Sequence, residues 1–185
     1  MEVKKILLNC FVGSLGLGAV LAILIFLIGK FGEIELDLLF TSMTIGLYSL
    51  FGLCCGILYD KTRYKSFSLI GLSLCVIAAL YTIGVIWEII AFDDVIKWSV
   101  IVFIISASVA HISLLLLVET RKFGLTYLRG ATICLSILVA ALLIFLLLRD
   151  LENIDNLFYR LLGILTVLDM CGTIITPIYA RVGVV

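Results

Sequence analysis

Residues 130–148 read GATICLSILVAALLIFLLL, and no charged side chain interrupts them. A helical membrane span needs about 20 consecutive apolar residues, and this stretch meets that requirement. Five further stretches of similar character fill most of the 185-residue chain. The six predicted spans are residues 6–28, 38–58, 66–87, 98–118, 130–148 and 160–180.

The composition points to the same class of protein. Hydrophobic residues make up 64% of the chain and charged residues 14%, and the mean hydropathy is +1.32. Soluble domains are about half apolar and about a quarter charged, and a chain of this size has too little interior to hide the excess. We therefore expect an all-α, polytopic integral membrane protein, a single transmembrane domain over residues 1–185 whose surroundings are the lipid bilayer.

The segments between the spans alternate in charge. One side of the membrane would hold both termini and the turns at 59–65 and 119–129. Nine basic residues fall on that side: Lys4, Lys5, Lys61, Arg63, Lys65, Arg121, Lys122, Arg129 and Arg181. The opposite side has four: Lys30, Lys97, Arg149 and Arg160. Short cytoplasmic loops carry the excess of Lys and Arg, so both termini are predicted to be cytoplasmic, and the short loops favour a bacterial inner membrane.

The first predicted span begins directly after Lys4 and Lys5, as the apolar part of a signal peptide would. Its apolar run is about 23 residues long, whereas the apolar region of a signal peptide has about 7–15. No small-x-small cleavage site ends the run. We expect this segment to be retained as a membrane helix.

The spans and their loops also suggest an internal repeat. Outer loops with acidic residues recur about every 60 residues at Glu33, Asp93 and Asn153, the last of which is flanked by Glu152 and Asp155, and basic turns recur between them. Repeating units of fixed length each bury their faces against the next unit. The interpretation is a six-helix bundle of three helical hairpins related by pseudo-threefold symmetry.

Polar side chains are concentrated in the second, fourth and sixth predicted spans. They include Tyr48, Ser49, Ser106, Ser108, His111, Ser113, Thr166, Asp169 and Thr173. Lipid offers no hydrogen-bond partners, so we expect these three helices to meet in the centre and the other three to face lipid. Small residues let membrane helices approach closely. In the first span, Gly13, Gly16 and Gly18 are the candidates for such contacts.

Asp169 is the acid placed deep inside a predicted span. An ionised carboxylate at that depth costs at least about 2.5–3.5 kcal/mol on insertion scales. His111, the single histidine of the sequence, is the candidate partner. Together with Tyr48, Ser108 and Thr173 these residues form the candidate intramembrane polar site, which could relay a proton or bind a cation. Two structural alternatives remain: a static hydrogen bond between the two helices, or a carboxyl bonded to Thr166 or Thr173 on its own helix.

Two further features of the sequence have structural explanations. Pro177 frees the carbonyl group of Thr173 and predicts a kink or an end of the last helix. The six cysteines all lie inside apolar segments, where disulfides are not expected to form. They are interpreted as packing residues.

The sequence contains no Walker A, G-x-G-x-x-G, H-E-x-x-H or G-x-S-x-G motif. One histidine rules out a multi-histidine metal site within one chain, and the short basic turns do not suggest nucleic-acid binding. We therefore expect no enzyme activity and no cofactor.

The leading hypothesis is an accessory or scaffold subunit that binds a membrane-protein partner or a second copy of itself. The alternative is a small channel, transporter or proton-linked sensor with a path between helices two, four and six, controlled by Asp169 and His111.

Overall fold

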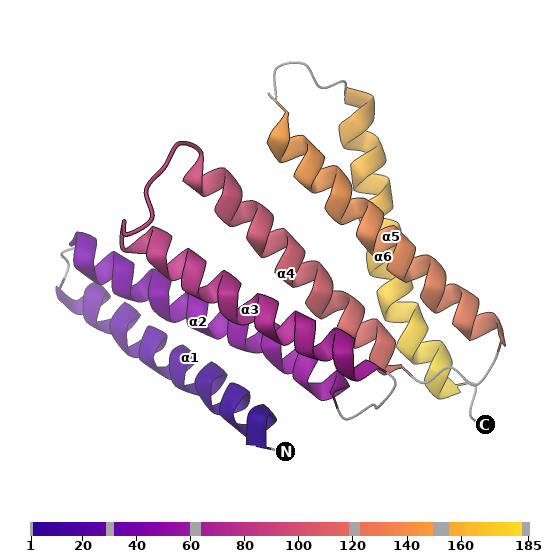
Figure 1. Ribbon diagram of the computed structural model, residues 1–185, viewed down its shortest axis with the longest axis horizontal. Helices are drawn as coiled ribbons and strands as arrows, with labels where there is room; N and C mark the ends of the chain where they lie inside the picture. The colour runs from indigo at the N-terminus through magenta and orange to yellow at the C-terminus, as the bar shows by residue number, and fades with distance from the viewer. Residues whose placement is uncertain (1, 29–31, 60–63, 119–122, 150–155, 183–185) are drawn as a thin grey trace. The chain divides into compact units, whose positions relative to one another are not determined.

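The computed structural model describes residues 2–28, 32–59, 64–118, 123–149 and 156–182. These residues form six α-helices and no strand, which confirms the all-α prediction. The helices, shown in Figure 1, are α1 (Glu2–Ile28), α2 (Glu33–Leu58), α3 (Lys65–Ile86), α4 (Val95–Leu117), α5 (Phe123–Leu148) and α6 (Asn156–Val182).

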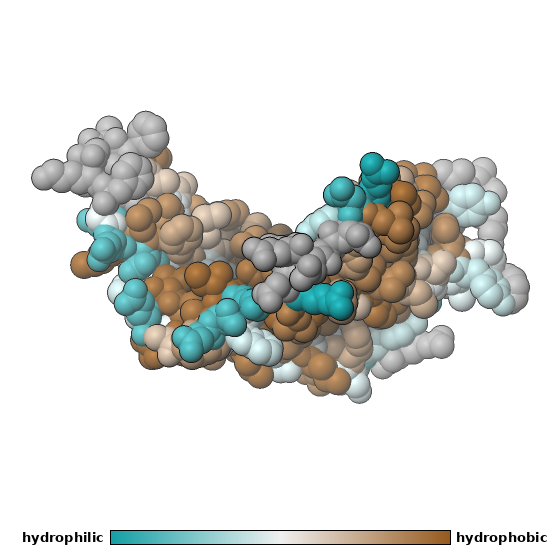
Figure 2. Space-filling view, turned by 90° about the horizontal axis from the view of Figure 1, so that it is seen from above, coloured by the Kyte–Doolittle hydropathy of each residue, from teal (hydrophilic) through white to brown (hydrophobic). Residues whose placement is uncertain are grey.

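Five of the helices, α2 to α6, are long and apolar enough to cross a membrane. Within α1, the described residues include a shorter apolar segment, Phe11–Leu24. Apolar side chains cover most of the face shown in Figure 2. These features are those of a multi-pass membrane protein, because large contiguous apolar surfaces are rare on soluble monomers.

Some helices extend beyond the predicted spans. α2 begins at Glu33 rather than at residue 38, and Glu33 and Glu35 lie in its first turn. Acidic side chains there interact favourably with the positive end of the helix dipole, so this acidic segment is helical rather than a loop. α5 likewise begins at Phe123 rather than at residue 130. Pro177 does not end α6, which continues to Val182.

The chain divides into two compact units, Met1–Ser106 and Ala107–Val185. The boundary falls within α4, so each unit contains part of this helix. The predicted single domain over residues 1–185 stays a prediction.

In the first unit, α2 packs against α1 on one side and α3 on the other (Figure 1). Small residues form the contact between α1 and α2. Ser42 Oγ donates a hydrogen bond of 2.6 Å to the carbonyl oxygen of Ser14. A Cβ atom at Gly18 would lie 3.1 Å from Ser42 Oγ, and one at Gly46 would lie 3.0 Å from Ser14 Oγ. The two backbones therefore approach closely because glycine and serine occupy the contact.

Aromatic hydrogen-bond donors connect α2 with α3 and the residue that follows it. Trp87 Nε1 donates to Thr41 Oγ1 at 3.0 Å, and Thr41 Oγ1 donates to the carbonyl oxygen of Asp37 at 2.6 Å. Tyr48 Oη lies 3.1 Å from Thr82 Oγ1, which donates to the carbonyl four residues before it at 2.9 Å. A threonine hydroxyl has one proton, so each threonine that donates to its own helix accepts from the aromatic group.

In the second unit, α5 packs against α6. A Cβ atom at Gly172 on α6 would lie 2.7 Å from Thr132 Oγ1 on α5, so any larger residue there requires the Thr132 side chain or its helix to move. Near the other end of the pair, the rings of Phe145 and Phe158 are 6.1 Å apart. The pair is therefore held by a small-residue contact and by an aromatic contact.

Contacts between helix ends agree with the predicted up-and-down order inside each unit. In the first unit, Trp87, after the end of α3, reaches Thr41 in the first third of α2. In the second unit, Arg129 near the start of α5 donates to the carbonyl oxygen of Val118 after the end of α4, at 3.0 Å. Most of the basic turn residues lie outside the described residues, so which end is cytoplasmic stays a prediction.

The threefold repeat and the central placement of α2, α4 and α6 also stay predictions. The closest helix pairs are α1 with α2, α2 with α3, and α5 with α6. No disulfide forms among the described cysteines, which are Cys54, Cys55, Cys75, Cys134 and Cys171. The side chain of Cys10 lies outside the described residues.

Candidate functional site

The second unit contains a polar cluster formed by α4 and α6. His111 on α4 and Asp169 on α6 lie beside one another, with His111 Nε2 4.0 Å from Asp169 Oδ2. The Asp169 side chain is 13% exposed and that of His111 is 30% exposed. At 4.0 Å the two groups form an ion pair if the imidazole is protonated, but the distance is too long for a direct hydrogen bond.

Thr173 completes this cluster, one helical turn after Asp169. Thr173 Oγ1 donates to the carbonyl oxygen of Asp169 at 2.8 Å and lies 2.9 Å from His111 Nε2. Because the hydroxyl proton goes to the carbonyl group, the imidazole must donate through its Nε2–H group. The same donor–threonine–carbonyl arrangement joins α2 to α3 in the first unit. A purely structural role for Thr173 is therefore in keeping with the rest of the molecule.

The carboxyl group of Asp169 has fewer hydrogen-bond partners than its two oxygen atoms can accept. Its Oδ1 atom is buried and has no hydrogen-bond partner among the described residues. Thr166, one of the predicted partners, donates to the carbonyl oxygen of Leu162 at 2.8 Å, and Thr173 bonds to the main chain of Asp169 rather than to its carboxyl group. An unpaired buried carboxylate is costly, and the basic group that lies beside it is His111.

The two other predicted site residues are Tyr48 and Ser108. Tyr48 belongs to the first unit, where it bonds to Thr82 and packs edge-on against Phe51 and Phe103 at ring distances of 6.0 and 6.5 Å. Ser108 lies on α4, nearly one turn before His111, and is half-buried. The structure thus brings together Asp169, His111 and Thr173, and the predicted path that includes Tyr48 stays a prediction.

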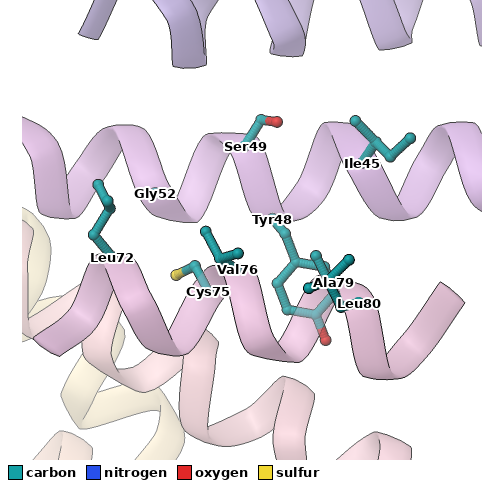
Figure 3. Close-up of a pocket in the computed structure, with 9 residues that line it drawn as sticks. All are labelled: Ile45, Tyr48, Ser49, Gly52, Leu72, Cys75, Val76, Ala79 and Leu80. Atoms are coloured by element: carbon teal, nitrogen blue, oxygen red, sulfur yellow. The ribbon is translucent and has the colours of Figure 1, made fainter. Parts of the chain in front are cut away.

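Sequence reasoning missed a groove in the first unit. It lies between α2 and α3 and is shown in Figure 3. Nine residues line it: Ile45, Tyr48, Ser49, Gly52, Leu72, Cys75, Val76, Ala79 and Leu80. Small side chains recur at helical spacing on both sides, at Ser49 and Gly52 on α2 and at Cys75 and Ala79 on α3. This pairing of small residues was the signal that could have predicted the groove.

Among the described residues, no group of three or more His, Cys, Asp or Glu side chains could hold a metal ion. No family model, curated protein or solved structure matches the chain. The site must therefore be interpreted from its own geometry.

Proposed function

We propose that this protein is a non-catalytic integral membrane protein that acts as an accessory or scaffold subunit. It would cross the cell membrane six times, with α1 as the first span and both termini in the cytoplasm. The excess of basic residues in alternate short loops supports this orientation. Its partner would be another membrane protein or a second copy of the chain, bound within the bilayer.

The observation that carries this proposal is an uncovered glycine face on α1. Nothing described lies within 4 Å of a Cβ atom built at Gly13 or Gly16, whereas one at Gly18 would touch Ser42 on α2. Gly18 therefore faces the rest of the unit, and the other two glycines face outward. Glycines on the outer face of a membrane helix allow a second helix to approach its backbone closely.

α6 offers a second uncovered surface. Of its membrane-spanning segment, 6% is buried, compared with 33% for α2. Its exposed side chains are mostly apolar, such as Ile164, Val167 and Ile174. In a membrane this surface contacts either lipid or the helices of a partner, so it is compatible with a docking role.

The proposal predicts that large residues at Gly13 and Gly16 disrupt assembly. In native membranes, the Gly13→Leu/Gly16→Leu double variant should lose at least about 90% of the higher-mass complex that gentle detergent extraction and native electrophoresis reveal for the wild type. Leu15→Phe is the matched control, because Leu15 is also exposed but lies on another face of α1 at 100° per residue. A wild-type protein that is extracted as a monomer without companions would contradict the proposal.

A second candidate function is favoured by the polar cluster of the second unit. The unpartnered Asp169 Oδ1 beside His111 suits a proton-linked channel, transporter or sensor, because ionisable residues inside membranes commonly serve such roles. Proton flux into liposomes that contain the purified protein tests it. Flux that falls at least about tenfold in Asp169→Asn would support this function. Wild-type flux no greater than that of empty liposomes, or equal flux in the wild type and the variant, would exclude it.

A further inference from the structure

Two cysteines from neighbouring helices form a thiol pair in the first unit. Cys55 lies near the end of α2 and Cys75 in the middle of α3, and their side chains lie within interaction reach of one another. Cys55 is fully buried and Cys75 is 3% exposed. Ser68 Oγ on α3 also donates to the carbonyl oxygen of Cys55 at 2.6 Å. The α2 backbone at Cys55 is therefore bonded to α3 about two helical turns before Cys75.

The groove between these helices gives a route to the pair. Cys75 lines it, and Figure 3 shows its side chain rising from α3 toward α2. The remaining walls are mostly apolar, with Leu72 and Val76 next to the thiol. Such a groove admits a small apolar molecule dissolved in the membrane more readily than it admits a charged reagent from water.

We propose that Cys55 and Cys75 are a modification site at which a membrane-soluble organic hydroperoxide joins α2 to α3 through a disulfide. In this step the peroxide O–O bond and two S–H bonds break, and one S–S bond forms. The two sulfur atoms lose two electrons, which reduce the peroxide. The two protons leave with the products, which are one alcohol and one water molecule.

The chemistry of the product favours this pair over the other cysteines. A disulfide is neutral, so it adds no charge to an apolar interior, whereas a sulfinic acid would. Cys54 is adjacent to Cys55 in sequence but points about 100° away around the helix. Cys134 and Cys171 are exposed and lie in the second unit. Cys55 is thus the partner that contacts Cys75 directly.

The test uses the intact protein in liposomes treated with cumene hydroperoxide. We expect the number of alkylatable thiols, counted after denaturation, to fall by two, with a mass decrease of about 2 Da that dithiothreitol reverses. Peptide mapping should identify a Cys55–Cys75 link. Cys54→Ser should still form the link, and Cys55→Ser should not form it.

An unchanged thiol count in the wild type, or a link that involves Cys54 instead, would overturn the proposal. Because the wild-type result decides the outcome, a variant that fails to fold does not affect the test.

Discussion

Replacing Gly172 with leucine is expected to destabilise the second unit by about 1–3 kcal/mol, the usual cost of forcing extra carbon atoms into a packed interface. A Cβ atom at this position would lie 2.7 Å from Thr132 Oγ1 and 3.1 Å from its Cγ2 atom. α5 and α6 would have to separate to make room for the side chain. Denaturant-induced unfolding in mixed micelles, followed by circular dichroism, measures the loss.

Gly163 provides a matched control on the same helix, because nothing described lies within 4 Å of a Cβ atom built there. Gly163→Leu should leave the free energy of unfolding unchanged or raise it, since leucine also has the higher helix propensity. A double variant tests the contact itself: Thr132→Ala should recover most of the stability that Gly172→Ala removes. Equal stabilities for Gly172→Leu and Gly163→Leu would show that α5 and α6 do not meet at this glycine.

Replacing His111 with leucine should also have a large effect, a loss of about 1–3 kcal/mol in the free energy of unfolding. The change removes the donor to Thr173 and the basic group beside Asp169. Adding Asp169→Asn to this variant should recover part of the loss, because the buried carboxyl group that lacks a partner is then gone. Such a recovery is a coupling between the two residues, and a double-mutant cycle measures it.

Thr173 and Thr166 serve as controls for the hydrogen bond in this cluster. Both donate to the carbonyl group four residues earlier on α6, but the contact with the imidazole is made by Thr173. Thr173→Val should therefore lower the free energy of unfolding more than Thr166→Val does. The difference should be about 0.6 and at most about 1.7 kcal/mol, the range of hydrogen bonds between membrane helices. Additive effects of His111→Leu and Asp169→Asn, with no difference between the two threonine variants, would contradict the proposed contacts.

Much of the fold could be predicted because apolar length is a strong signal. The segment 130–148 and its five counterparts each fall mostly within one observed helix. Helix starts were harder to predict. Hydropathy does not register the favourable interaction of Glu33 and Glu35 with the helix dipole, nor the continuation of α5 back to Phe123.

The candidate site was predictable in part for a similar reason. Asp169 and His111 stand out because ionisable groups are rare inside apolar spans, and the single histidine was the candidate partner of the aspartate. The sequence could not indicate that Thr173 would bond to the imidazole, because that contact depends on how α6 is rotated. The contact between Cys55 and Cys75 was missed for the same reason, since each cysteine alone looks like an ordinary packing residue.

The central claim is that the chain crosses the bilayer repeatedly, with its basic turns in the cytoplasm and its acidic loops outside. Single cysteines at Lys61 and Asp93, each introduced into a cysteine-free variant, test it directly with a membrane-impermeant maleimide. The account predicts that intact cells label Asp93→Cys, whereas Lys61→Cys reacts only after the membrane is permeabilised. Labelling of Lys61→Cys in intact cells, or equal labelling of both variants, would contradict it.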